Sequence, residues 1–207
     1  MAPPTSSSAK SYRLDRDWAT DAAYLKAQSD DGLWLHKNAC RTGPASAFIR
    51  FGESLGNDLC HNDIVADIGG NDGFSANAFY LAHKIRPIVV DCLPDRLAHA
   101  DRAYRLTTVE CFIDQHIPLD DNAIDWAFCS HTLEHVRDLN AAISEIARVV
   151  RRGVYFVVPI EDASSHMEHA YDIRRVSTWR KFISKHFKVK LAKSAFSKEA
   201  HIYGVPR

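Results

Sequence analysis

Short apolar runs alternate with segments of helical periodicity along most of the chain, and this alternation limits the possible folds more than any other feature. Between the last two runs, Ala142, Ile143 and Ile146 recur at helical spacing, and Gly153 follows where we expect that helix to stop. Strands that alternate with helices are typical of a parallel sheet covered by helices. We therefore predict an α/β protein with parallel strands at residues 64–68, 87–91, 108–113, 124–129 and 154–158.

Weaker patterns lie on either side of these strands. Two helical patterns precede the first strand, one around Ala22 and one that follows Pro44 and carries the apolar stripe Phe48, Phe51 and Leu55. A helix-like stretch at 179–186 and two β-rich segments, 187–192 and 201–205, close the chain. We expect a single domain made of a disordered lead (1–12), an N-terminal helical cap (13–62) and a core (63–207).

Composition excludes several classes of protein. The 207 residues suffice for one such domain, and no apolar run approaches the ~20 residues of a membrane-spanning helix. The N-terminus has neither the basic nor the apolar region of a secretory signal. We expect a cytoplasmic protein with reduced thiols, a zinc or disulfide site being the alternative. The cysteines, none in C-x-x-C spacing, are Cys40, Cys60, Cys92, Cys111 and Cys129.

Charge is unevenly distributed along the chain, although its formal net value is +0. Nine basic residues and no Asp or Glu lie between residues 174 and 198. This basic segment is either a solvated face or a surface that attracts an anionic acceptor, such as a phosphorylated sugar, a nucleotide or RNA. Its basic residues are Arg174, Arg175, Arg180, Lys181, Lys185, Lys188, Lys190, Lys193 and Lys198.

The first predicted strand ends in a glycine-rich loop with the sequence D-I-G-G-N-D-G at residues 67–73. Glycine has no Cβ, so it allows a sharp turn and lets a ligand approach the backbone. The dinucleotide fingerprint G-x-G-x-x-G, placed from Gly69, requires glycine at positions that hold Asn71 and Phe74. The spacing therefore argues against a nicotinamide site.

The loop instead resembles the D/E-x-G-x-G-x-G motif of class I S-adenosylmethionine-dependent methyltransferases. Asp67, Gly69 and Gly73 fall in register. Asn71 replaces the central glycine, and asparagine is among the few residues that tolerate left-handed backbone angles. A similar G-x-N-D-G loop occurs in some sugar-modifying methyltransferases. The resemblance implies that S-adenosylmethionine lies over Gly69 to Gly73, in contact also with Gly70 and Asn71.

Two further strand ends carry acids where this family has them. Asp91 ends the second strand and, by the resemblance, accepts hydrogen bonds from the ribose hydroxyls, with Cys92 beside it. Asp114 follows the third strand, where the family's acid faces the adenine amine while an apolar neighbour, here Ile113, contacts the ring. Ser130, after the fourth strand, completes the expected cofactor site.

The fourth strand adds a longer resemblance. The sequence D-W-A-F-C-S-H-T-L-E-H-V at residues 125–136 is similar to the family's D-x-(apolar)-x-S-x-x-L-E-H-V segment. Together the matching segments span about half of the chain. They imply a Rossmann-like class I methyltransferase fold, with a mostly parallel seven-stranded sheet, an antiparallel C-terminal hairpin and helices on both faces.

Histidines cluster after the fourth and fifth strands. His131 and His135 lie four residues apart around Glu134, and His166 and His169 follow in the later loop. These residues are structural, or His135, His131 or His169 is a general base for the acceptor proton, or the cluster binds a divalent metal. Some ubiquinone-pathway and small-RNA methyltransferases carry a metal-binding E-x-x-E-H motif here. Because His131 replaces the first glutamate, we expect no metal.

The sequence therefore predicts methyl transfer from S-adenosylmethionine to an oxygen or nitrogen of a small or glycan-linked, anionic acceptor. We expect the acceptor to enter between the cap, with Trp18, Trp34 and His36, and the loop at 161–171. No N-P-P-Y or D-P-P-Y motif follows the fourth strand, which argues against methylation of the adenine amine in DNA, and no Pro-Cys pair stands there, which argues against a cytosine C5 enzyme. The alternatives are an RNA methyltransferase that uses the basic segment, with metal-assisted 2′-O transfer, and a non-catalytic cofactor-binding subunit.

Overall fold

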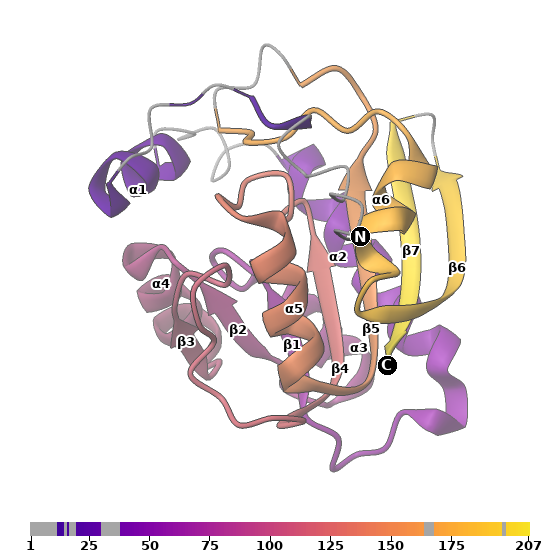
Figure 1. Cartoon of the computed structure of the whole chain (residues 1–207). Helices are drawn as coiled ribbons and strands as arrows, with labels where there is room; N and C mark the ends of the chain where they lie inside the picture. The colour runs from indigo at the N-terminus through magenta and orange to yellow at the C-terminus, as the bar shows by residue number, and fades with distance from the viewer. Residues whose placement is uncertain (1–11, 15, 17–19, 30–37, 164–167, 196–197) are drawn as a thin grey trace.

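A seven-stranded sheet forms the centre of the molecule (Figure 1), with the strand order β3-β2-β1-β4-β5-β7-β6. This computed structural model describes residues 12–14, 16, 20–29, 38–163, 168–195 and 198–207. Strands β1 to β5 pair in parallel, whereas β7 is antiparallel to both β5 and β6. The predicted fold class is thus confirmed. The strands are β1 (Val65–Ile68), β2 (Ile88–Asp91), β3 (Thr108–Glu110), β4 (Ile124–Ser130), β5 (Val150–Pro159), β6 (Phe187–Ala195) and β7 (Glu199–Pro206).

Helices cover both faces of this sheet. Apolar residues of α5 and α6 pack on one face, and those of α2 and α3 pack on the other. Helix α4 packs beside β2 and β3, while α1 lies over the end of the sheet where the parallel strands finish (Figure 1). The helices are α1 (Asp21–Ser29), α2 (Asn38–Leu55), the 3₁₀ turn η2 (Gly56–Asp58), α3 (Phe74–His83), α4 (Pro94–Tyr104), α5 (Leu139–Val149) and α6 (Val176–Ile183).

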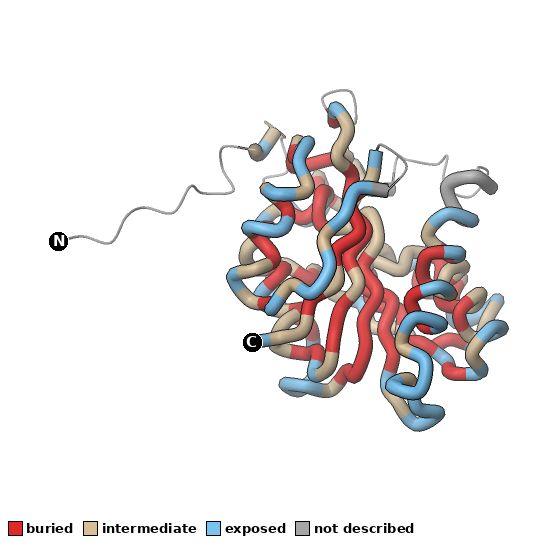
Figure 2. Tube along the Cα trace, turned by 90° about the vertical axis from the view of Figure 1, so that its right-hand side faces the viewer, coloured by how far each residue is buried: buried red, intermediate tan, exposed pale blue. Residues whose placement is uncertain are grey.

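Strand β4 divides the core between the two faces. Ala127 and Cys129 pack on the α5 side, whereas Trp126 and Phe128 pack on the α2 side, because successive side chains of a strand point to opposite faces. The Phe128 ring stacks on Phe48 of α2 with 4.5 Å between ring centroids. Full burial of a side chain of this size stabilises the fold by about 1.5–3 kcal/mol. Figure 2 shows that the buried residues follow the strands and the inner sides of the helices.

Helix α5 begins at a capping aspartate and ends earlier than predicted. Asp138 Oδ1 accepts hydrogen bonds from two backbone N–H groups of the first turn, at 2.9 and 3.1 Å. The helix ends at Val149, so the prediction that Gly153 stops it was wrong. Gly153 lies inside β5, where a Cβ would come within 2.8 Å of the Tyr203 ring. Packing between strands, and not helix termination, accounts for glycine here.

Several other boundaries also differ from the prediction. The third strand ends at Glu110 instead of residue 113, because the chain turns where Phe112 O accepts backbone hydrogen bonds from residues 115 and 116. Pro44 lies inside α2 and not at its start. The helix after β5 begins at Val176 instead of residue 179. The apolar stripe after Pro44 packs inward as expected, and Phe48 is fully buried.

The N-terminal segments have different positions in the structure. Helix α2 belongs to the layer that covers the sheet, whereas α1 lies over the strand ends. The structure does not describe residues 1–11 of the predicted lead. It also does not describe three residues of the predicted cap, Trp18, Trp34 and His36. No helix among the described residues is long and apolar enough to cross a membrane. Free thiols are present at Cys60, Cys92, Cys111 and Cys129.

Candidate active site

The loop that follows β1 folds back onto the end of β2. The backbone N–H groups of Gly69 and Gly70 donate to Val90 O at 2.7 and 3.2 Å. Three residues of the loop have positive φ angles, Gly69 at 73°, Asn71 at 51° and Gly73 at 78°. Asn71 thus adopts the left-handed conformation for which asparagine is suited. The loop turns without a central glycine and keeps its backbone at the strand ends.

Asp91 connects this loop to the end of β2. Its Oδ2 accepts a hydrogen bond from the backbone N–H of Asn71 at 2.9 Å, and its Oδ1 accepts one from Leu93 at 3.0 Å. Burial raises the pKa of Asp91, and these N–H donors partly offset that effect. Each carboxylate oxygen has a second lone pair, so the side chain can accept further hydrogen bonds from a ligand.

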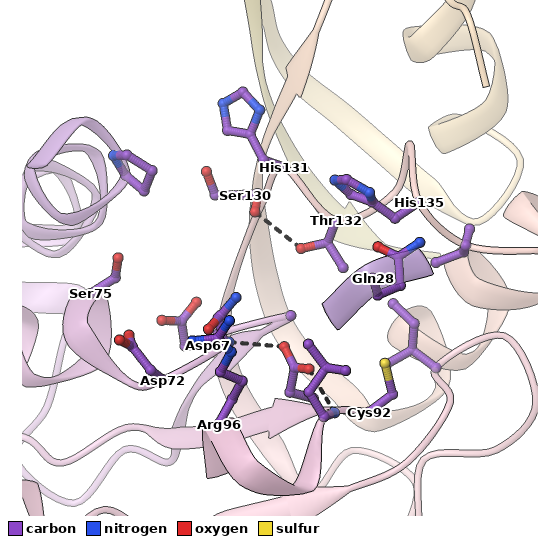
Figure 3. A pocket seen from close by; sticks show the side chains of 18 of the residues that line it. Gln28, Asp67, Asp72, Ser75, Cys92, Arg96, Ser130, His131, Thr132 and His135 are labelled. Atoms are coloured by element: carbon purple, nitrogen blue, oxygen red, sulfur yellow. Dashed lines mark hydrogen bonds between the residues drawn. The ribbon is translucent and has the colours of Figure 1, made fainter. Parts of the chain in front are cut away.

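These residues line a cavity at the carboxyl ends of the parallel strands (Figure 3), the region where open α/β sheets bind ligands. Tyr24 and Gln28 of α1 close it from one side, and Glu168 of the loop after β5 borders it as well. Most of the predicted cofactor residues contribute to the lining. They are Asp67, Gly69, Gly70, Asn71, Asp91, Cys92, Ile113 and Ser130.

Two predicted cofactor residues, Gly73 and Asp114, do not line this cavity. Asp114 Oδ2 accepts hydrogen bonds from the backbone N–H groups of Arg137 and Asp138 at 2.8 and 3.0 Å, so it fixes the start of α5. At Gly73 a Cβ would lie 2.8 Å from Ala100, which explains glycine here by close packing against α4. Within this structure both residues support the site's framework instead of facing the cavity.

Asp67 is a buried acid with an unusual charge environment. Its side chain lines the cavity, and its Oδ2 has no hydrogen-bond partner among the described residues. Burial first, and then repulsion from Asp91 and Asp72, raises the pKa of Asp67 to about 8. The three acids at this side of the cavity therefore favour a positively charged group on a ligand.

His131 follows β4 and lies between two carboxylates. Its Nε2 is 3.1 Å from Glu199 Oε1, and its Nδ1 is 3.3 Å from Glu134 Oε1. Burial alone would lower the pKa of His131, but the contacts with Glu134 and Glu199 raise it to about 10. The ring is therefore an imidazolium near neutral pH. Its backbone has a φ of 50°, so the residue occupies a sparsely populated conformation.

Glu134, His135 and His169 form a group beside this ion pair, in which Glu134 and His169 are buried and His135 is half-buried. Their ligand atoms lie within 4.8 Å of one another, and Glu134 is fully buried. His135 Nδ1 is 2.9 Å from the backbone carbonyl of Glu168. Because a carbonyl only accepts, Nδ1 carries the proton of the neutral ring and Nε2 has the free lone pair. The group could act on a proton or hold a divalent cation. His166 lies outside the described residues.

Comparison with known proteins identifies the region that contains most of this site. A family model described as a methyltransferase domain matches residues 66–158. The match spans the strands from β1 to β5 and the loops that line the cavity after β1, β2 and β4. No curated protein sequence matches the chain.

Solved structures share the fold at low sequence identity. A chain from the complex between the Haloferax volcanii Trm112 methyltransferase activator and a putative methyltransferase has a TM-score of 0.65 and 17% identity, covering 82% of this chain and 94% of its own. Geranyl diphosphate C-methyltransferase from Streptomyces coelicolor, bound to S-adenosyl-L-homocysteine, has a TM-score of 0.65 at 12% identity. This match covers 78% of this chain and 76% of the Streptomyces chain. An S-adenosylmethionine-dependent methyltransferase from Thermotoga maritima, a possible histamine N-methyltransferase, has a TM-score of 0.62 and 15% identity. This match covers 89% of this chain and 99% of the Thermotoga chain.

The site also contains residues that sequence reasoning missed. Thr132 lines the cavity and donates from Oγ1 to the backbone carbonyls of Ile68 and Ser130, at 3.2 and 3.0 Å. Glu199 reaches His131 from the C-terminal hairpin. No local motif marks either residue. The L-E-H-V resemblance covered the segment around Thr132, but the acid at position 199 lies 68 residues from its partner.

The basic segment lies away from the cavity. Its described residues belong to α6, to β6 at an edge of the sheet, and to the adjoining turns, and none lines the cavity. Arg174 pairs with Asp162 and Asp172, at 3.0 and 2.6 Å, and Lys198 pairs with Glu161 at 3.0 Å. Lysines on an exposed edge strand also discourage pairing with another sheet. These positions fit a solvated face.

Proposed function

We propose that this protein is an S-adenosylmethionine-dependent methyltransferase that transfers a methyl group to an oxygen or nitrogen of a small-molecule acceptor. The observation that carries the proposal is the cavity formed by the β1 loop and Asp91 at the strand ends. In this proposal Asp91 binds the ribose, the backbone at 69–71 approaches the methionine part, and Ile113 contacts the adenine. The acids Asp67 and Asp91 suit a cofactor that carries positive charge.

We propose His135 as the group that removes the acceptor proton. When bound, S-adenosylmethionine supplies an electrophilic methyl group and a leaving group that needs no protonation. The protein then has to hold the acceptor in line and accept its proton. His135 lines the cavity, and its Nδ1–H is fixed by Glu168 O, which leaves Nε2 as the proton acceptor. His131 is occupied by carboxylates on both nitrogens and does not suit this task.

A divalent cation is the second candidate for this group. Glu134 is fully buried, and within the described part of the chain neither of its carboxylate oxygens has a well-aligned hydrogen bond. Such an acid next to His135 and His169 fits a cation site, since carboxylate and imidazole together suit zinc, manganese or iron. Glu134, His135 and His169 would hold the ion, which would supply Lewis-acid orientation of acceptor oxygens.

The charge of the cavity lining supports a different acceptor from the one that the basic segment suggested. The expectation of an anionic acceptor rested on that segment, whose described residues lie outside the lining. Without counting Asp67, whose pKa is about 8, the lining acids Asp72, Asp91 and Glu168 outnumber the cationic residues Arg96 and His131. We therefore propose a small neutral or amine-bearing acceptor, free or linked to a glycan, in preference to RNA.

The experiment that tests the function has two parts. Calorimetry with S-adenosylhomocysteine should detect binding in the cavity. Transfer from radiolabelled S-adenosylmethionine is then measured on a panel of small alcohols, phenols, amines and RNA. Labelling of RNA alone would reject the small-molecule acceptor. No labelling of any acceptor, with intact cofactor binding, would favour a non-catalytic subunit.

The same assay separates the base from the cation. His135→Ala should lower turnover by about 10²–10⁴-fold if His135 is the base. His61→Ala, at an exposed turn position, is the matched control and should have the wild-type rate. If the group holds an ion, chelation should abolish turnover and added Mn²⁺ or Zn²⁺ should restore it. Wild-type rates for His135→Ala and for His169→Ala, both insensitive to chelator, would exclude both chemical roles.

A further inference from the structure

Glu199 brings the C-terminal hairpin to the edge of the active site. It is the first residue of β7 and pairs with Pro159 of β5 on one side and Ala195 of β6 on the other. Its Oε1 lies 3.1 Å from Nε2 of His131. An acid from the antiparallel end of the sheet thus contacts a residue that lines the cavity at its parallel centre.

His131 is held by its backbone and by both nitrogens of its ring. Its backbone N–H donates to Val157 O at 2.9 Å, which fixes the main chain in the left-handed conformation. The imidazole is then held from both sides, by Glu134 at Nδ1 and by Glu199 at Nε2. The contact with Glu199 is a hydrogen bond and the contact with Glu134 is an ion pair, so the two carboxylates together favour one orientation of the ring.

Glu199 is itself contacted by the buried His201 of the same strand, which in turn contacts a tyrosine of β5. Its Oε2 lies 3.4 Å from Nε2 of His201, and Nδ1 of His201 lies 3.0 Å from the Tyr155 hydroxyl. His201 is only 6% exposed, whereas the Glu199 side chain is 34% exposed. A row of polar contacts therefore runs from Tyr155 through His201 and Glu199 to His131.

Glu134 extends this row beyond His131, and it also lies next to the proposed base, His135. Glu134 Oε1 lies 3.3 Å from His131 Nδ1 and 3.7 Å from His135 Nε2. A fully buried carboxylate is costly unless a positive partner stays close to it. His131 is such a partner, and its other ring nitrogen contacts Glu199.

We propose that Glu199 is a positioning residue of the active site, which holds His131 against Glu134 and thereby fixes Glu134 beside His135. The inference rests on the proposed function, since it assigns Glu199 a part in ordering that function's catalytic group. It does not place Glu199 in contact with cofactor or acceptor. The hairpin β6–β7 thus contributes, through Glu199, a contact that orients side chains of the site.

The test compares Glu199→Ala, Glu199→Gln and the control Lys193→Gln, whose side chain is exposed on β6 of the same hairpin. Histidine-ring ¹⁵N correlation spectra at pH 7 report the hydrogen bonding of His131 and His135. Calorimetry with S-adenosylhomocysteine, on the same samples, reports separately on the proposed function. Because Glu199 does not line the cavity, the affinity should stay within about twofold in all three variants.

We expect Glu199→Ala to shift the ring signals of both His131 and His135. Glu199→Gln keeps an acceptor oxygen and should retain the wild-type signals, as should Lys193→Gln. Tyr155→Phe, which removes only the hydroxyl that contacts His201, should give a smaller shift at His131. Unchanged signals in Glu199→Ala, or equal shifts in Glu199→Gln and Glu199→Ala, would overturn the positioning role. Loss of S-adenosylhomocysteine binding in wild-type protein would instead contradict the proposed function.

Discussion

Asp91 accepts a hydrogen bond from the backbone of Asn71, so the loops that follow β1 and β2 form one unit. The bond is 2.9 Å long and lies at the edge of the cavity. The binding of a ligand that contacts either loop therefore depends on the positions of both loops. This relationship explains why the acid at position 91 has a structural effect in addition to the ribose contact that we propose.

Replacement of Asp91 by alanine should weaken S-adenosylhomocysteine binding by about 2–4 kcal/mol, because charge-assisted hydrogen bonds contribute ~1.5–3 kcal/mol each and are not additive. The Asn71 backbone would also lose its acceptor. Calorimetry measures the change. Glu110→Gln, at the exposed residue in register with Asp91 on β3, is the matched control and should bind normally. Equal affinity of Asp91→Ala and wild type would disprove the proposed cofactor position.

Gly69→Ala should lower the free energy of unfolding by about 2–4 kcal/mol. Gly69 has a φ of 73°, and a Cβ there would overlap the Thr132 side chain, which bonds the carbonyls of Ile68 and Ser130. Urea denaturation measures the loss. Gly43→Ala is the control, because nothing lies within 4 Å of that position in α2, and it should gain about 0.5–1 kcal/mol. Similar unfolding curves for the two variants would contradict this account.

Much of the fold and of the cofactor loop could be predicted because their signals are local. Apolar runs and helical spacing placed the five parallel strands, and the D-I-G-G-N-D-G segment identified the turn after β1. The left-handed conformation of Asn71 could be predicted because asparagine is one of the few residues that tolerate it. Each inference depended on residues a few positions apart, which the linear sequence displays directly.

Other features could not be predicted because they depend on contacts between distant segments. Gly153 was taken for a helix stop, but its small size is required by Tyr203 on a strand formed 50 residues later. The pairing of His131 with Glu199 depends on how β7 returns beside β5. The basic segment gave a clear charge signal, yet a count of charges does not say which face of the sheet carries them.

Glu145→Gln should destabilise the protein at neutral pH by about 1–2 kcal/mol, after allowance for solvent screening. Hydrogen bonds from Arg148, followed by the backbone N–H of Ile117, lower the pKa of Glu145 to about 2, against the burial that opposes them. A lowered pKa contributes stability that is present above the unfolded value, about 4.5, and is lost as pH falls through about 2. The difference between variant and wild type should therefore shrink as pH falls below about 4.5.

Urea unfolding between pH 7 and pH 3 tests this expectation. Asp121→Asn serves as the control, because Asp121 is the other partner of Arg148 but its side chain is 71% exposed. It should change stability by about 0–0.5 kcal/mol at any pH. A loss in Glu145→Gln that stays constant over this pH range would show that the charge of Glu145 is not its source.

Binding of S-adenosylmethionine should release a proton from Asp67 near neutral pH. With a pKa of about 8, this acid is mostly protonated at pH 7 in the free protein. Positive groups on the ligand would stabilise the carboxylate and lower that pKa on binding. The ligand thus prefers the deprotonated form, so affinity should rise with pH, by at most about tenfold per unit, and level off above about 8.

Calorimetry at pH 7 in two buffers of different ionisation enthalpy measures the proton release. Asp67→Asn cannot release a proton and should bind with an affinity nearly independent of pH between 6 and 8. Asp95→Asn, at an exposed position of α4 outside the lining of the cavity, should release as much as wild type. If Asp67→Asn also matched the wild type, the proton would come from another group, and the charge repulsion among Asp67, Asp91 and Asp72 would not govern cofactor binding.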